Sequence, residues 1–313
     1  MPSSTYSASQ LQEVENSFHF FWDKKLKLTH KNLEKCQSWI VPFLPLSIEN
    51  LNIRIQRIRE YFSPRSFAIK TPDNALLHGT FFQNTQSLET DLPTIIIFSA
   101  SGELHKMGSY SWIFDFADKD FLFNVLAFDY RGTGESMGKI TCPGLIMDGC
   151  CILEYLNSLH VSSKNFILYG FSLGAAIASE AAGIYGLKEG KIILDRTFSS
   201  LRELISHLLG NGLFGTCISR ILAWMGWDLN ILRQIKKISS KRLILYSIDD
   251  LVIPFKKSLY RALEKKDSLQ NVNIVQLKEI RKKGEEPHNL PLPFFCDAKG
   301  TPVKDIFLKF ISH

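Results

Sequence analysis

Short apolar runs alternate with longer amphipathic segments along most of the chain. After a hairpin expected around the turn sequence TPDN, the runs are rich in Ile, Leu, Val and Phe, which is typical of strands covered on both faces. Helix-length segments separate them, so the pattern predicts a mostly parallel sheet of about eight strands with helices on both faces. The expected strands are residues 66–70, 75–82, 94–100, 123–129, 165–170, 191–195, 242–247 and 271–277, and the expected helices lie near residues 108–118, 144–159, 173–187, 255–266 and 303–312.

Two regions depart from this alternation. Residues 1–63 contain no strand pattern, and their apolar residues from Leu11 to Leu26 recur at steps of three and four, which predicts a helical N-terminal extension. Residues 199–236 form a long, apolar helical insertion between the sixth and seventh strands. We therefore expect the extension to be followed by one α/β domain over residues 64–313, which carries the insertion as a lid.

Both regions have features of surfaces that contact lipid. In the insertion, Trp224 and Trp227 are three residues apart and are expected to share a helical face. In the N-terminal helix, Phe18, Phe21 and Trp22 precede a run of lysines, an aromatic and basic composition typical of interfacial helices. Peripheral membrane contact is one expectation, and permanent packing of the helix on the flank of the sheet explains the same pattern.

The composition is that of an ordinary globular protein, with 45% hydrophobic and 22% charged residues. The formal charge of +6 is compatible with an anionic membrane surface, but the basic residues are not concentrated as in nucleic-acid-binding proteins, so no nucleic-acid partner is expected. The first residues lack the basic segment and apolar core of a signal peptide. We therefore expect a cytoplasmic protein, or one exported without a signal peptide. The six cysteines have no metal-ligand spacing, so reduced thiols and no metal site are predicted.

The sequence NFILYGFSLGAAIAS places Ser172 between Gly170 and Gly174, where an apolar strand gives way to an alanine-rich helix. Gly-x-Ser-x-Gly at such a junction is typical of a nucleophile elbow, in which the serine lies on a strained turn that only small neighbours allow. The same short string also occurs in ordinary tight turns. The interpretation therefore depends on the rest of the chain.

The sequence FDYRGTGESMG at residues 128–138 supplies that context, together with Asp148 in the following helix and the elbow at Ser172. In order and spacing these motifs resemble the α/β-hydrolase superfamily over roughly residues 64–313. The chain looks most similar to soluble, lid-bearing serine hydrolases, which include lysophospholipase-like and acyl-thioesterase members. In those proteins the arginine loop is structural, so Arg131 is expected to brace the sheet edge. The overall pattern, including DRTFSSL after the sixth strand, is also similar to lipase-like effectors of intracellular bacterial pathogens.

The resemblance implies a catalytic serine, acid and histidine in that chain order. Ser172 is the expected nucleophile, and His288, in a loop after the last strand, is the expected base. Asp250 is the expected acid because a proline follows it four positions later, as in the family pattern. Asp195, at the end of the sixth strand, is the alternative acid, and Asp249 is expected to be a turn residue or a secondary acceptor.

The same resemblance implies two backbone N–H donors for the oxyanion of an acyl-transfer intermediate. Leu173 is the expected first donor because it follows the nucleophile at a helix N-terminus. The second donor usually lies in a His-Gly stretch after the third strand, which here reads Ser-Ala-Ser-Gly-Glu over residues 99–103. This departure leaves the identity of the second donor open, and Ser101 is the residue we select.

These residues predict a serine hydrolase that cleaves carboxylic esters or thioesters, with a small-molecule or lipid acyl substrate and neither a metal nor an organic cofactor. A serine peptidase of the same fold and a catalytically silent binding module are the alternatives. Silent relatives usually lose a residue of the triad, whereas this chain has a candidate at each position, which favours an enzyme. The substrate class depends only on the apolar composition of residues 199–236.

Overall fold

The computed structural model describes residues 58–87, 91–100, 105, 109–117, 120–210, 212–235, 237–265, 272–280 and 286–312. The predicted N-terminal extension therefore lies outside the described residues up to residue 57. A helical turn at residues 58–61 leads into the first described strand.

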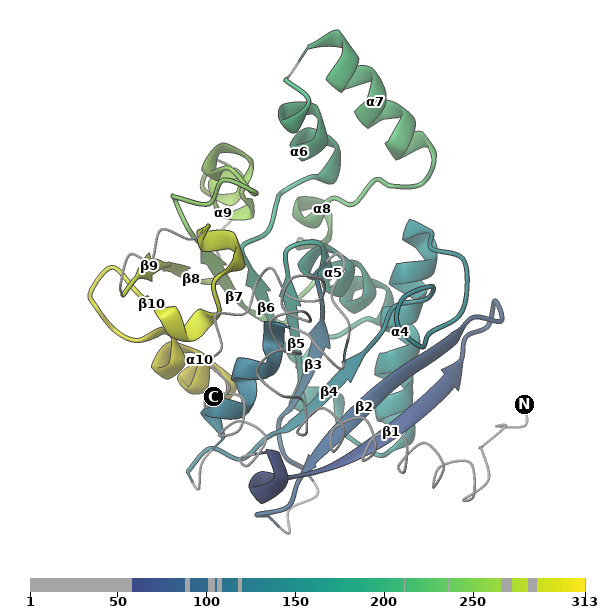
Figure 1. Ribbon diagram of the computed structural model, residues 1–313, viewed down its shortest axis with the longest axis vertical. Helices are drawn as coiled ribbons and strands as arrows, with labels where there is room; N and C mark the ends of the chain where they lie inside the picture. Colours follow the sequence, from purple (N-terminus) through teal and green to yellow (C-terminus); the bar gives the residue numbers. More distant parts are fainter. Residues whose placement is uncertain are drawn as a thin grey trace, which may run out of the picture.

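An eight-stranded sheet with the order β1-β2-β4-β3-β5-β6-β7-β8 forms the centre of the protein (Figure 1). The β1–β2 hairpin and the β2–β4 pair are antiparallel, and all other neighbours are parallel. The predicted mostly parallel sheet with an antiparallel start is thus confirmed. The strands are β1 (Phe62–Lys70), β2 (Leu76–Asn84), β3 (Thr94–Phe98), β4 (Asn124–Phe128), β5 (Phe166–Phe171), β6 (Lys191–Asp195), β7 (Lys241–Tyr246) and β8 (Val272–Gln276).

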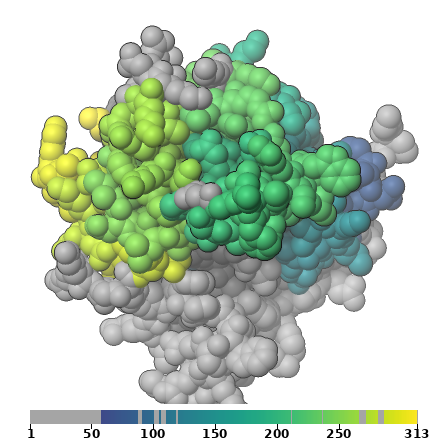
Figure 2. Space-filling view, turned by 90° about the horizontal axis from the view of Figure 1, so that it is seen from above, coloured from purple at the N-terminus to yellow at the C-terminus, as the bar shows by residue number. Residues whose placement is uncertain are grey.

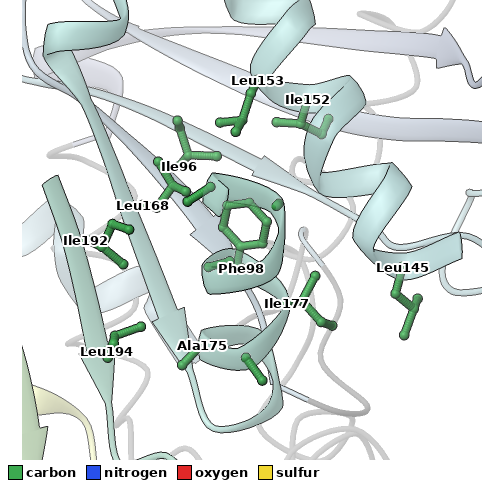
Figure 3. Packing of buried hydrophobic residues seen from close by; sticks show 14 of the residues in the cluster. Ile96, Phe98, Leu145, Ile152, Leu153, Leu168, Ala175, Ile177, Ile192 and Leu194 are labelled. Atoms are coloured by element: carbon green, nitrogen blue, oxygen red, sulfur yellow. The ribbon is translucent and has the colours of Figure 1, made fainter. Parts of the chain in front are cut away.

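Helices cover both faces of the sheet. Successive residues of β3 point to opposite sides, so Ile96 and Phe98 pack in one hydrophobic cluster and Ile95 and Ile97 in the other. Figure 3 shows the first cluster, where Phe98 lies among side chains from the sheet and from two helices, including Ile177. The longest helices of this first side are α4 (Cys142–Ser158) and α5 (Leu173–Tyr185), and those of the second are the 3₁₀ helix η1 (Ser109–Phe116) and α10 (Val303–Ser312).

Three segments differ in detail from the predicted elements. The expected helix near residues 108–118 is the 3₁₀ helix η1. The expected helix at residues 255–266 is split into η3 (Phe255–Lys257) and α9 (Leu259–Glu264), because the Ser258 side chain caps the second piece by accepting from the Arg261 N–H. A two-stranded sheet of β9 (Lys278–Glu279) and β10 (Phe295–Cys296) was not predicted. The remaining short 3₁₀ helices are η2 (Ser163–Asn165), η4 (Pro287–Asn289) and η5 (Leu292–Phe294).

The insertion between β6 and β7 contains α6 (Leu201–Leu208), α7 (Leu213–Trp224) and α8 (Ile231–Ile235). Figure 1 shows α6 and α7 as a hairpin that projects beyond the sheet, whereas α8 lies beside α5. The prediction that Trp224 and Trp227 share a helical face is wrong. Gly226, with a φ of +95°, leaves the helical path after α7, so Trp224 is exposed while Trp227 packs against the core.

The five described cysteines are free thiols. Burial raises the pKa of Cys142, Cys150 and Cys151 to about 11, which keeps these thiols protonated at neutral pH. Cys217, on α7, is the exposed member of the described set. Within the described ranges no group of three or more His, Cys, Asp or Glu side chains is arranged to hold a metal ion. Of the helices whose residues are described, none has both the length and the apolarity needed to cross a bilayer.

Candidate active site

Ser172 lies on the sharp turn between β5 and α5. Its φ of +54° is in a region that side-chain-bearing residues rarely adopt. A Cβ atom at Gly170 would collide with the backbone of Ala175, and one at Gly174 would collide with the carbonyl oxygen of Phe98. The two glycines therefore permit the close approach that holds Ser172 in this strained position, as expected of a nucleophile elbow.

The structure brings Ser172, His288 and Asp250 together in one hydrogen-bonded line. His288 Nε2 lies 3.1 Å from Ser172 Oγ, and His288 Nδ1 lies 2.8 Å from Asp250 Oδ2. The side chains of His288 and Asp250 are both buried, with 6% and 2% of their surface exposed. Because water is largely excluded from this pair, the electrostatic attraction between them is only weakly screened.

Local hydrogen bonds hold the two loops that carry the histidine and the acid. The Ile253 N–H donates to Asp250 Oδ1 over 2.7 Å, so the turn before the proline at 254 fixes this carboxylate. Glu286 Oε1 accepts from the Leu251 N–H over 2.8 Å and from the His288 N–H over 3.4 Å. Glu286 therefore bridges the loop after β7 to the loop that contains His288.

The other two candidate acids point elsewhere. Asp249 is exposed, and its N–H donates to Ser247 Oγ over 3.3 Å, which agrees with a turn residue. Asp195 is fully buried but accepts hydrogen bonds from Tyr169 and Arg196 rather than from His288. Asp250 is thus the carboxylate that the structure pairs with His288.

Of the two predicted oxyanion donors, the structure describes Leu173 but not Ser101. Leu173 is the first residue of α5, at the end of the helix where backbone N–H groups and the helix dipole favour an anion. Ser101 lies outside the described residues. Nearby in the chain, the His105 N–H donates to Asp129 Oδ1 over 2.7 Å, and His105 Nδ1 lies 2.8 Å from Asp129 Oδ2. Asp129 thus ties His105, which follows β3 in the chain, to the loop after β4.

The arginine of the loop after β4 has a structural position, as expected. Arg131 is buried, its Nε donates to Asp148 Oδ1 over 2.9 Å, and its Nη1 and Nη2 both donate to the Asp73 carboxylate. These bonds hold the pKa of the Asp73 carboxyl at about 2, below its usual value. Arg131 thus links α4 to the β1–β2 turn.

The polar residues around the predicted site that the sequence analysis did not identify are Tyr169, Arg196 and Glu286. A signal existed for one of them. The pair Asp195–Arg196 ends an otherwise apolar strand, and two adjacent charges in such a place must be paired if the strand is buried. For the others the chain offers no comparable pattern, because their contacts join residues from distant segments.

Comparison with known proteins gives the same fold and a consistent set of relatives. The α/β hydrolase fold family model matches residues 93–214. Protein bem46 of Schizosaccharomyces pombe is 29% identical over 187 residues, which are 59% of this chain and 60% of that protein. The lysophosphatidylserine lipase ABHD12 of Danio rerio is 27% identical over 164 residues, 47% of this chain and 41% of the lipase. The chain therefore matches only about half of the length of these curated relatives.

Solved structures provide a separate comparison of the fold. The esterase Pf2001 of Pyrococcus furiosus aligns with a TM-score of 0.53 at 18% identity, over 71% of this chain and 83% of the esterase. At this identity the similarity shows the fold alone. The sheet order, the family match over residues 93–214 and the relatives taken together show that the chain has the α/β-hydrolase fold and is similar to members of that superfamily.

Proposed function

We propose that the protein is a serine hydrolase that cleaves carboxylic esters or thioesters of acyl lipids through a Ser172–His288–Asp250 triad. The observation that carries the proposal is the continuous line from Ser172 Oγ through both ring nitrogens of His288 to Asp250. A serine hydroxyl is a weak nucleophile unless a base accepts its proton and a third group orients that base. The three residues meet both requirements.

Acylation would begin when Ser172 Oγ attacks the carbonyl carbon of the substrate. His288 Nε2 accepts the hydroxyl proton, and Asp250, on the other ring nitrogen, stabilises the resulting imidazolium. The carbonyl oxygen becomes an oxyanion beside the N-terminus of α5, where the Leu173 N–H is one proposed donor and Ser101 the other. Each such donor contributes about 3 kcal/mol to the stability of the transition state.

The intermediate then collapses, the bond to the leaving oxygen or sulfur breaks, and His288 returns its proton to the departing alcohol or thiol. A water molecule attacks the acyl-Ser172 ester while His288 accepts one of its protons. Collapse of the second intermediate releases the carboxylic acid and regenerates the Ser172 hydroxyl. These steps use the three triad side chains, the proposed oxyanion donors, the substrate and one water molecule.

The acyl part of the proposal rests on the α6–α7 hairpin and on the name of one relative. The exposed face of α7 is mostly apolar, and Leu213 and Trp224 expose 88% and 87% of their surface. The protein from Danio rerio that matches 47% of this chain is named a lysophosphatidylserine lipase. A substrate with a long acyl chain is chemically suited to such a surface.

We also propose that this hairpin contacts a lipid surface while the enzyme acts. Exposed large apolar side chains follow β4, β6 and β7, whose carboxyl ends lie at the same edge of the sheet as Ser172. Figure 2 shows this side, with the green α6–α7 hairpin beside the yellow-green residues that follow β7. The apolar residues are Met137, Ile140, Leu208, Leu209, Leu213, Phe214, Ile221, Trp224, Met225, Ile248, Leu251 and Val252.

Basic residues lie beside the apolar side chains of the hairpin. The sequence of α7 contains one charged residue, Arg220, which is exposed, and Lys256 and Lys257 lie in the neighbouring segment after β7. Lys257 Nζ lies 3.9 Å from Glu203 Oε2, so this segment and α6 are adjacent. Basic residues near an apolar helix face strengthen its binding to anionic lipid headgroups.

The test is turnover of a matched series of substrates by the wild-type protein and by Ser172→Ala. We expect hydrolysis of octanoyl and palmitoyl esters and thioesters, slower hydrolysis of acetyl esters, and none of these activities in Ser172→Ala. Cleavage of peptide amides in preference to every ester would instead support the peptidase alternative. A wild-type protein that turns over no member of the series, although it is folded, would support a silent binding module.

A further inference from the structure

Arg196 is a buried arginine in a strained backbone conformation next to the proposed triad. Its φ is +41°, and only 3% of its surface is exposed. Arginine at positive φ costs free energy and persists only when the surroundings hold it there. Arg196 lies close to Ser172, because the residue before it, Asp195, accepts a hydrogen bond from the Ser172 N–H at its carbonyl oxygen over 3.0 Å. The strain at Arg196 therefore calls for a role beyond filling space.

One edge of the guanidinium is fixed by a carboxylate. Arg196 Nε and Nη2 donate to Asp195 Oδ1 and Oδ2 over 2.8 Å each, in the two-pronged geometry that a planar guanidinium allows. Tyr169 Oη donates to the same carboxylate over 2.7 Å. Asp195 and Tyr169 belong to neighbouring strands of the sheet, so this edge of Arg196 is anchored to the most rigid part of the fold.

The remaining donors of Arg196 reach the loop that carries the histidine. Arg196 Nη1 donates to the carbonyl oxygens of Pro287 and Leu290, each over 2.6 Å, and these two residues bracket His288. Phe171 lies between the charged group and the imidazole, with the guanidinium carbon 4.8 Å from its ring centre and the His288 ring 5.0 Å from it. Arg196 thus grips the histidine loop without touching the imidazole.

We propose that Arg196 is a positioning residue that holds the loop of His288 in register with Ser172. This proposal rests on the proposed triad and adds to it a clamp formed by Asp195, Arg196 and the two loop carbonyls. Within residues 286–290 the Asn289 N–H donates to the Glu286 carbonyl and the Leu290 N–H to the Pro287 carbonyl, bonds that stay inside the loop, whereas the two bonds from Arg196 tie the loop to the end of β6. A displacement of about 1 Å at a catalytic group can slow a reaction about 100-fold, so such a clamp affects the rate.

The clamp explains why Asp195, the alternative candidate for the catalytic acid, does not pair with His288. Asp195 uses both oxygens on Arg196 and one of them also on Tyr169. A lysine could not replace Arg196, because an ammonium group cannot hold a carboxylate with two parallel bonds and reach two carbonyl oxygens at the same time. Arginine is therefore specifically suited to this position.

The first experiment compares Arg196→Lys with Arg131→Lys in the full chain. Both arginines are buried and pair with carboxylates, but Arg131 links α4 to the β1–β2 turn and, among the residues that the structure describes, has no bond to the loop of His288. For an octanoyl ester we expect Arg196→Lys to lower kcat at least about tenfold with KM changed less than about twofold. Arg131→Lys is expected to lower the melting temperature while kcat, measured well below that temperature, stays close to the wild-type value.

A second variant removes the clamp without leaving a buried charge. The double substitution Asp195→Asn with Arg196→Met deletes both ions, a change that is often tolerated in protein interiors. Here too we expect a lower kcat with KM nearly unchanged, and faster amide hydrogen exchange for residues 287–290. A wild-type kcat in this folded double variant, or equal losses of kcat in Arg196→Lys and Arg131→Lys, would overturn the clamp. If the wild-type protein hydrolyses no ester, the proposed function fails, and the exchange rates alone then decide whether Arg196 holds the loop.

Discussion

In the polar network around Ser172 charged side chains are buried, whereas on the α6–α7 hairpin apolar side chains are exposed. In the network, the charged groups of Asp195, Arg196 and Asp250 are almost fully buried, and each has a defined partner. On the hairpin, Leu213 and Trp224 are almost fully exposed. Buried charges require precise partners within the fold, whereas exposed apolar groups gain free energy only from a surface outside it. The first region is therefore suited to the chemical step and the second to binding of a substrate or of a lipid surface.

The largest effect is expected at the acid of the network. Asp250→Asn should lower kcat by about 10⁴-fold, because an amide favours the wrong tautomer of the histidine. Asp249→Asn is the matched control, since Asp249 is adjacent in the sequence but exposed. Steady-state kinetics on a soluble short-chain ester measures both. A large loss in Asp195→Asn together with near-normal rates in Asp250→Asn would reverse the assignment of the acid.

Substitutions in the hairpin should weaken lipid binding but leave the chemical step unchanged. Replacing Leu213, Phe214 and Trp224 together by serine should weaken binding to anionic liposomes at least about tenfold, since each buried apolar side chain contributes about 1.5–3 kcal/mol. The same variant should lose activity on palmitoyl esters in liposomes but keep its rate on acetyl esters. Ile184→Ser is the control, because Ile184 is 67% exposed on α5, outside the hairpin. Unchanged liposome binding in the triple variant would mean that the hairpin does not contact the lipid surface.

The sequence of the N-terminal extension predicts a helix that either contacts lipid or packs permanently on the flank of the sheet, and truncation separates these two interpretations. If the helix binds lipid, removal of residues 1–30 should reduce the binding of the chain to anionic liposomes by a few fold and leave acetyl ester hydrolysis unchanged. If the helix packs on the sheet, the truncation should instead lower the melting temperature without changing liposome binding. Co-sedimentation and thermal unfolding of the truncated chain separate the two outcomes.

The smallest effect is expected at the structural arginine. Arg131 lowers the pKa of the Asp73 carboxyl to about 2 from an ordinary value of 3.8, chiefly through a side-chain hydrogen bond, so the folded state favours the ionised form. The resulting stability is present above pH 3.8 and is lost as the pH falls towards 2. Because Asp73 is 43% exposed, the contribution is at most about 1 kcal/mol.

Asp73→Asn should accordingly lower the melting temperature by at most about 3 °C at pH 7, and the difference from the wild-type protein should shrink between pH 4 and pH 2. Thermal unfolding followed across this pH range measures it. A difference that is independent of pH would mean that the hydrogen bonds of Asp73, not its charge, stabilise the turn.

Most of the fold followed from the sequence because the central strands of its sheet are buried on both faces. Runs such as TIIIF and KIILD contain four and three consecutive apolar residues, and each forms a strand at the predicted place. The two-residue strands β9 and β10 are too short to leave a pattern. The break after residue 257 depends on the Ser258 cap, which competes with continuation of the helix and could not be recognised from apolar spacing.

The candidate site was predictable where backbone geometry restricts the residue type. The glycines at 170 and 174 mark the strained turn of Ser172, and the proline at 254 marks the turn after Asp250. The choice between Asp250 and Asp195 could not be derived from the residues alone, because both follow buried strands. It depends on Arg196, whose partners Pro287 and Leu290 are about ninety residues away in the chain.

Reaction with a fluorophosphonate probe, followed by mass spectrometry of the labelled peptide, tests the central claim most directly. Fluorophosphonates phosphonylate a serine that an adjacent base has activated, so the reagent reports the chemistry without knowledge of the substrate. We predict a single label on Ser172 in the wild-type protein, none in Ser172→Ala, and a melting temperature nearly the same in both. Undiminished labelling of Ser172→Ala, or a folded wild-type protein that does not react, would contradict the account.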